Sequence, residues 1–270
     1  MPPDQRPPPA RSVTGWSPED GPGLDTALEQ LSSEELTVQG RLPWSSNLTF
    51  LVTVGDDPVT GRQDPDETVA TGREPLRAVY KPASGEQSLW DFPDGLYRRE
   101  VAAYALSEAL GWGLVPPTVD RDDGPFGPGS LQLFVEADYQ QHYFTLFEED
   151  RHRHTLLAMC AFDVAANNAD RKSGHVLKGT DGRLWGIDHG LCFHHHDKLR
   201  TVIWDFADVD VPDTLLTDLD GLATHLPDDL VRLLSEPERE ALVGRIRRLV
   251  ASGVFPEPTG DRPPYPWPLV

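Results

Sequence analysis

The sequence predicts an α+β protein of two lobes, the first rich in strands and the second mainly helical. Short apolar runs bounded by turn residues fill the first half, whereas apolar residues recur with helical spacing in the second. A chain of 270 residues is long enough to bury a full core. We expect a disordered Pro-rich N-terminus over 1–22, an N-lobe over 23–136, a C-lobe over 137–254 and a Pro-rich tail over 255–270.

The N-lobe is predicted to hold a short helix, five strands and one longer helix. The short helix is expected at 24–31, and the strands at 36–42, 47–54, 77–81, 115–119 and 130–136. The acidic, turn-rich stretch 55–75 is expected to be an exposed loop. The longer helix, over 95–110, has apolar residues at helical spacing and stops at Gly111.

The C-lobe is predicted to be helical around one β-hairpin. Residues 155–166 form an apolar helical pattern, and further helices are expected at 213–219 and 228–234. Ser235 and Glu238 make a capping box that opens a last helix ending near residue 251.

Composition limits the classes of partner. Acidic residues outnumber basic ones by 44 to 24, so nucleic acids and anionic lipid surfaces are disfavoured as main partners. The sequence lacks an apolar run of 18 residues and a basic start followed by an apolar segment. Cys160 and Cys192 lie on expected core segments, which fits a reducing compartment. We therefore expect a cytoplasmic protein that is not integral to a membrane.

Two short motifs carry the chemistry. Residues 170–175 read Asp-Arg-Lys-Ser-Gly-His, and residues 187–193 read Ile-Asp-His-Gly-Leu-Cys-Phe. Asp181-Gly182 between them predicts a hairpin with a two-residue turn. That register places His175 directly opposite Asp188, close enough for the pair to hold one divalent cation, with Asp170 just before the hairpin.

These motifs resemble the catalytic core of the phosphatidylinositol 3-/4-kinase-like branch of the protein kinase superfamily. The type II phosphatidylinositol 4-kinase pattern reads Asp-Arg-Gly-Asn-Asp-Asn, then Ile-Asp-Asn-Gly-Leu-Ala-Phe. A set of bacterial, mostly actinobacterial, kinase-like proteins is similar along the whole chain. The resemblance implies a bilobal protein-kinase-like fold, with an antiparallel sheet and one helix in the N-lobe, and an ATP-dependent phosphotransferase activity.

The resemblance also implies roles around the phosphoryl group. Asp170 would orient the acceptor hydroxyl and take its proton, and Lys172 would neutralise charge on the transferred group. Asp188 would bind the metal. His175 replaces the usual Asn, and imidazole suits Mn²⁺ or Zn²⁺ as well as Mg²⁺. Asn167 or Asn168 is the alternative source of an amide oxygen.

The nucleotide would lie against the N-lobe. Lys81 would reach the α and β phosphates and pair with Glu100, for which Glu108 is the less well placed alternative. A surface strand lysine and a solvated helix acid are the simpler interpretations of Lys81 and Glu100. Neither phosphate-binding glycine motif occurs. The remaining candidates are the turn residues Ser45, Ser46 and Asn47 over the phosphates, and the hinge residues Phe134, Val135 and Glu136 at the adenine.

Two other functions compete with a kinase. The missing Asn and glycine loop would also suit a nucleotide-binding pseudokinase or scaffold. The histidines at 189 and 194–196, with Asp188, would suit a zinc or manganese hydrolase, although consecutive loop residues point in different directions. The acceptor stays open, and the acidic charge favours a protein or small molecule over a lipid.

Overall fold

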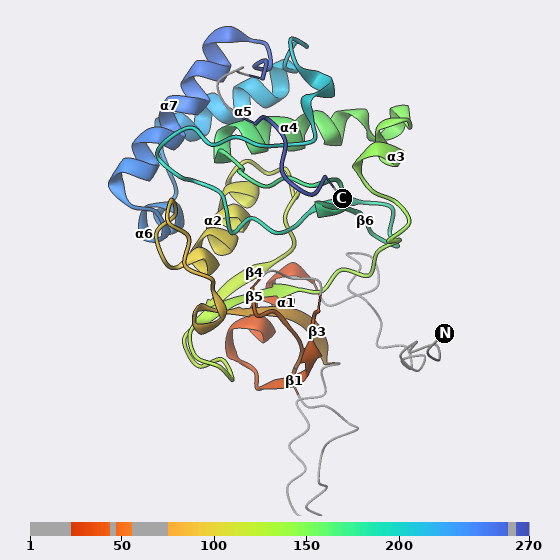
Figure 1. Ribbon diagram of the computed structural model, residues 1–270, viewed down its shortest axis with the longest axis vertical. Helices are drawn as coiled ribbons and strands as arrows, with labels where there is room; N and C mark the ends of the chain where they lie inside the picture. Colours follow the sequence, from red (N-terminus) through yellow and green to blue (C-terminus); the bar gives the residue numbers. More distant parts are fainter. Residues whose placement is uncertain (1–22, 44–46, 56–74, 259–262, 270) are drawn as a thin grey trace, which may run out of the picture.

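The computed structural model describes residues 23–43, 47–55, 75–258 and 263–269 (Figure 1). The predicted disordered segment 1–22 lies outside the described residues, as does nearly all of the predicted loop 55–75. The predicted class is confirmed: a five-stranded antiparallel sheet forms the N-lobe, and helices form most of the C-lobe.

The N-lobe sheet has the strand order β1-β2-β3-β5-β4. Side chains of β3 alternate between two faces, because successive residues of a strand point in opposite directions. Ala78 and Tyr80 are fully buried in the N-lobe core, whereas Lys81 lies on the opposite face and is partly exposed. The strands are β1 (Leu36–Arg41), β2 (Phe50–Val54), β3 (Leu76–Pro82), β4 (Thr118–Arg121) and β5 (Gly129–Leu133).

Two helices pack on this sheet. The first, α1 (Leu24–Ser33), contributes the fully buried side chains of Ala27 and Leu31 to the N-lobe core. The second, α2 (Leu96–Ala109), lies between the sheet and the C-lobe (Figure 1). It begins after Gly95, whose φ of 89° favours glycine. Because α2 is covered on several sides, even Glu100 on it is only 2% exposed.

The C-lobe is built around α4, against which α7 packs (Figure 1). Fully buried Phe162 on α4 and Ile246 on α7 belong to the same apolar cluster. This core fixes the end of α4, from which the loop that carries Asp170 departs. The helices are α3 (Tyr143–Phe147), α4 (Arg153–Ala166), α5 (Asp213–Thr224), α6 (Asp228–Leu233) and α7 (Glu236–Ser252).

Element boundaries differ from the prediction where the backbone context overrides the apolar pattern. The strand expected at 115–119 begins only at Thr118, after Pro116 and Pro117, which have no N–H to donate to a sheet. The strand expected at 130–136 ends at Leu133. Short α3 was not predicted, and α5 continues five residues beyond its predicted end.

The hairpin register is corrected by one residue. Strand β6 (Val176–Lys178) pairs with β7 (Leu184–Gly186) so that Val176 faces Gly186, and His175 therefore neighbours Ile187 instead of Asp188. The loop holds three residues, because Gly182 N donates to Gly179 O at 2.9 Å and Gly179 N to Arg183 O at 2.8 Å. Gly182, with φ 81°, closes this longer loop.

The C-terminal tail docks on the C-lobe. Phe255 is buried in the core, Trp204 Nε1 donates to Pro264 O at 2.8 Å, and Ser173 N donates to Leu269 O at 2.8 Å. The chain end thus lies beside the loop that precedes β6 (Figure 1). Within the described ranges, we find no helix with the length and apolar composition needed to cross a bilayer.

Candidate active site

A lysine from the sheet meets two acids from elsewhere in the chain. Lys81 Nζ is ion-paired with Glu100 on α2, and lies 2.8 Å from Asp188 Oδ1 just after β7. Glu100 also accepts a hydrogen bond from His189 N at 2.9 Å. The structure therefore brings Glu100 to Lys81. Glu108, eight residues further along α2, is exposed at the end of that helix.

The three charges stabilise one another. Burial opposes the ammonium charge of Lys81, but Asp188 and Glu100 outweigh this effect and raise its pKa. The Lys81 ammonium in turn holds the pKa of Asp188 well below its usual range. Both groups are charged at neutral pH. Asp188 nevertheless keeps a side chain that is 45% exposed, so its carboxylate remains open to a ligand.

His175 faces the other oxygen of Asp188, despite the change in register. Its Nε2 lies 3.4 Å from Asp188 Oδ2. Asp188 reaches this position with a left-handed backbone, φ 61°, a conformation that is uncommon outside glycine and often marks functional sites. Burial lowers the pKa of His175 to about 4, so the imidazole is neutral at pH 7, as a metal ligand must be.

The spacing of this pair suits a shared cation. Two ligand atoms that each lie about 2.1 Å from one metal ion are roughly 3.0 to 3.4 Å apart for bond angles between octahedral and tetrahedral. The observed 3.4 Å falls at the upper end of that range. Within the described ranges, no group of three or more His, Cys, Asp or Glu side chains is arranged to hold a metal. A cation here would draw its other ligands from water and phosphate.

Asp170 and Lys172 form a second pair beside this one. Lys172 Nζ lies 3.0 Å from Asp170 Oδ2, and both side chains are partly exposed. Burial raises the pKa of Asp170, while Lys172 acts in the opposite direction. The negative charge of Asp188 also raises the Asp170 pKa, which places the two carboxylates within electrostatic range. Lys81, Asp188 and His175 thus share one site, and Asp170 lies within electrostatic range of it.

Beneath the site lies a buried network that the sequence did not reveal. Asp163 on α4 is ion-paired with Arg171 at 2.9 Å, and both side chains are almost wholly buried. Arg171 also donates to His175 O at 3.2 Å and Ile187 O at 3.1 Å, and it contacts His189 Nε2 at 2.8 Å. This guanidinium therefore ties the loop of Asp170 to the segments that carry His175 and Asp188.

A signal for this network was present in the sequence. Asp163 follows Phe162 within an apolar helical segment, and a charged residue among core positions requires a buried partner. Arg171, eight residues further along the chain, could provide that partner, but only the fold brings the two side chains together.

The alternative ligands are occupied elsewhere. The Asn167 side chain donates to His194 O and His196 O and accepts from Lys198 N, and Asn168 bonds Asp163 and the Asp170 N–H. His189 is buried and neutral, because burial and Arg171 hold its pKa well below its usual range. The His194 ring stacks on that of His195, and the His196 ring is tilted by 49° relative to His195. Both asparagine side chains are thus engaged within the protein.

The remaining nucleotide candidates are only partly described. Ser45 and Ser46 lie outside the described residues. Asn47 Oδ1 accepts a hydrogen bond from Gln87 N at 2.9 Å, beyond the end of β3. At the hinge, Phe134 N already donates to Arg77 O, and Glu136 O accepts from Thr180 N.

Val135 is the hinge residue with both backbone groups free. Among the described residues, none bonds its N–H or C=O. The residue packs against the N-lobe core and is 7% exposed as a whole, so its hydrogen-bonding groups are those of the backbone.

Comparison with known proteins identifies the family and the fold of this chain. No family model matches the chain. Protein Rv2133c of Mycobacterium tuberculosis is 40% identical to this chain over an alignment of 278 residues. The alignment covers 88% of this chain and 93% of that protein. The chain belongs to the same family as this relative.

Two solved structures show the fold. Hydra Fam20, determined with a sugar, has a TM-score of 0.55 at 14% identity, covering 86% of this chain and 88% of that one. The Helicobacter pylori proinflammatory kinase CtkA has a TM-score of 0.50 at 10% identity, covering 83% and 94%. The predicted protein-kinase-like fold is therefore confirmed.

Proposed function

We propose that this member of the Rv2133c family is an ATP-dependent phosphotransferase that transfers the γ-phosphoryl group to a hydroxyl acceptor. The observation that carries the proposal is the junction of Lys81 with Glu100 and Asp188. It joins a strand lysine, a helix acid and an acid after a hairpin, the three parts that bind nucleotide phosphates and metal in protein kinases.

The nucleotide would lie between the lobes, with 23–136 on one side and 137–254 on the other. Lys81 is held by Glu100 in a position to bind the α and β phosphates. Ser45, Ser46 and Asn47 would cover the phosphates from the turn between β1 and β2. At the hinge we assign the adenine hydrogen bonds to the backbone of Val135, since Phe134 and Glu136 already use one backbone group each.

Asp188 and His175 would hold one Mg²⁺ or Mn²⁺ ion. Their 3.4 Å separation and the neutral imidazole fit this role. When bound, the ion would neutralise charge on the β and γ phosphates. The nitrogen ligand favours Mn²⁺ more than an amide oxygen would.

Asp170 would orient the acceptor hydroxyl and accept its proton. The acceptor oxygen then forms a bond to the γ phosphorus while the bond from phosphorus to the bridging oxygen breaks, and ADP leaves with that electron pair. Lys172, 3.0 Å from Asp170, would neutralise charge on the moving group. The raised pKa of Asp170 makes this carboxylate a better proton acceptor than an unperturbed one.

The phosphatidylinositol 3-/4-kinase-like branch remains our assignment for the two motifs. It rests on residues 170–175 and 187–193, and we extend it to the phosphoryl chemistry only. The net charge of −20 would oppose binding to an anionic lipid surface. We therefore favour a protein or small-molecule acceptor. Free Cys160 and Cys192 are consistent with a cytoplasmic location.

A nucleotide-binding pseudokinase is the second candidate. This function is favoured by His175 at the position of the usual Asn. The presence of Asp170, the residue that would act as the general base, disfavours it. Tight binding of Mg-ATP or Mn-ATP without phosphoryl transfer would identify such a protein.

The decisive experiment follows labelled γ-phosphate from ATP into a cell extract. We expect Asp170→Asn to leave ATP affinity unchanged and to lower transfer by about 10² to 10⁴-fold, the usual contribution of a general base. Asp220→Asn, an exposed change on α5, is the matched control and should transfer normally. Undiminished transfer by the Asp170 variant would remove Asp170 as the base.

A further inference from the structure

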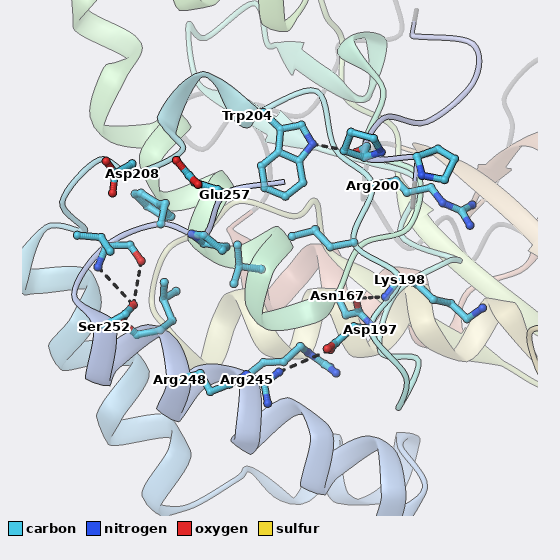
Figure 2. Close-up of a pocket in the computed structure, with 18 residues that line it drawn as sticks. Asn167, Asp197, Lys198, Arg200, Trp204, Asp208, Arg245, Arg248, Ser252 and Glu257 are labelled. Carbon is cyan, nitrogen blue, oxygen red and sulfur yellow. Dashed lines mark hydrogen bonds and ion pairs between the residues drawn. The ribbon is translucent and has the colours of Figure 1, made fainter. Parts of the chain in front are cut away.

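A cavity of about 610 Å³ lies in the C-lobe (Figure 2). Its walls come from the end of α4, the segment 197–208, the end of α7 and the docked tail. Volumes of about 300 to 1,000 Å³ are typical of small-molecule sites. Apolar side chains form much of the lining: Val164, Leu199, Trp204, Leu249, Val254 and Phe255.

One buried cation, Arg245 of α7, belongs to this lining. The residue is 5% exposed, and its Nε and Nη1 donate to Ala165 O at 2.8 Å and His194 O at 3.2 Å. Nη2 is buried with no hydrogen-bond acceptor. The charge of Asp197 acts on this guanidinium from a distance, but Asp197 is ion-paired with the neighbouring Arg248, and no described carboxylate forms an ion pair with Arg245. Burial lowers the pKa of Arg245 to about 10, which leaves it charged at neutral pH.

A buried charge without an ion pair is costly, because it has lost water and gained no anion in direct contact. Other buried arginines in this protein have one: Arg171 pairs with Asp163 and Arg99 with Glu238. Arg245 is the exception within the described ranges. An anion from outside the chain would correct this imbalance.

The other charged groups around the cavity are paired or lie at its edge. Lys198 Nζ pairs with Asp91 at 2.7 Å. Arg248 lies 3.6 Å from Asp197, and these two side chains are largely exposed. Arg200 lies at the rim, and the exposed Asp208 and Glu257 lie at the end away from Arg245 (Figure 2). A ligand's negative group therefore belongs at the Arg245 end.

We propose that this cavity binds a small amphipathic anion, whose carboxylate or phosphate group pairs with Arg245 and whose apolar body packs against Trp204, Leu249 and Phe255. The site is separate from Lys81 and Asp188, and the proposal does not depend on phosphoryl transfer.

Calorimetric titration of the full chain tests the proposal with decanoate, decyl phosphate and decan-1-ol. The three probes share an apolar chain, so the head group alone differs. We expect one anion to bind per chain and the alcohol to bind about tenfold more weakly or worse, since it cannot pair with the charge. The tighter of the two anions identifies the head group. Equal binding of decan-1-ol, or no binding of either anion, would overturn the proposal.

Variants locate the binding. Arg245→Met should weaken decanoate binding by about tenfold or more, with little effect on decan-1-ol. Arg247→Met, a change on the same helix at an exposed arginine outside the cavity lining, should bind decanoate like the natural chain. Equal losses in both variants would contradict the assignment.

A second variant keeps the test valid if Arg245→Met does not fold. Ser252 is exposed and lines the cavity, so Ser252→Trp should fill part of it without disturbing the core. We expect this variant to keep its thermal midpoint and to lose decanoate binding. A folded Ser252→Trp protein with unchanged affinity would place the ligand elsewhere.

Discussion

Two acid–base clusters in this protein contain the same kinds of side chain. In the Asp188 cluster, Asp188 pairs with Lys81, and these side chains are 45% and 20% exposed. In the Asp163 cluster, Asp163 pairs with Arg171, and the exposed fractions are 0% and 1%. The first cluster is partly open to solvent, whereas the second is buried.

The difference is one of hydrogen-bond saturation. Asp163 accepts from Arg171, Asn168 and Thr201, so both of its oxygens are used within the chain. Asp188 has one ammonium on Oδ1 and a more distant imidazole on Oδ2, which leaves room for a cation. A saturated buried carboxylate positions the loop, and an unsaturated, partly exposed one is available for chemistry. Residue type alone does not separate these two roles.

The largest effect is expected from Asp188→Asn. Loss of this carboxylate removes the charged metal ligand, so metal-dependent ATP binding should fall below detection. Calorimetric titration of ATP with Mg²⁺, and separately with Mn²⁺, measures it, with Asp220→Asn as the control. Unchanged ATP affinity in this variant would show that the Asp188 cluster does not bind the metal.

Asp163→Asn should have the largest effect on stability. Removing the anion leaves Arg171 buried without its counter-ion, a change that typically costs about 3 to 5 kcal/mol. Asp188→Asn should change the free energy of unfolding by less than about 1 kcal/mol, as for other partly exposed pairs. Urea denaturation of both variants gives the two values. Equal losses would abolish the distinction between the clusters.

A smaller effect is expected at Glu238, whose ion pair with Arg99 links α2 to α7 at 2.5 Å. Burial alone would raise the pKa of Glu238, but Arg99 and Ser235 outweigh it and hold the pKa below its usual range. The stability from ionised Glu238 is therefore complete above the unfolded-state pKa and is lost as the pH falls through the lower folded-state pKa.

Glu238→Gln should thus cost about 2 kcal/mol at pH 7 and progressively less in acid below about pH 4.5. Denaturation curves of the natural chain and this variant at pH 7 and pH 3 measure the difference. A cost that is the same at both pH values would mean that the charge of Glu238 does not contribute.

The sequence by itself determined the two-lobe class, most helices and strands, and the order of Lys81, Glu100, Asp170 and Asp188. These features depend on local patterns: helical spacing in α2 and α4, a capping box at Ser235, and short motifs whose chemistry resembles a known family. Such signals act between residues that are close along the chain. Glu100 could be identified because its position within the helical pattern of α2 is also a local feature of the sequence.

Only the tertiary structure decided the hairpin register, the free backbone at Val135, the ion pair of Asp163 with Arg171 and the uncompensated charge of Arg245. Whether a charged side chain finds a partner depends on which distant segments the core brings against it. The three-residue loop at Gly182 shifted the register, yet His175 still lies 3.4 Å from Asp188, which has a left-handed backbone. Contacts of this kind are set by packing across the whole lobe. A local pattern can show that a buried charge needs a partner, but it does not show which distant residue provides it.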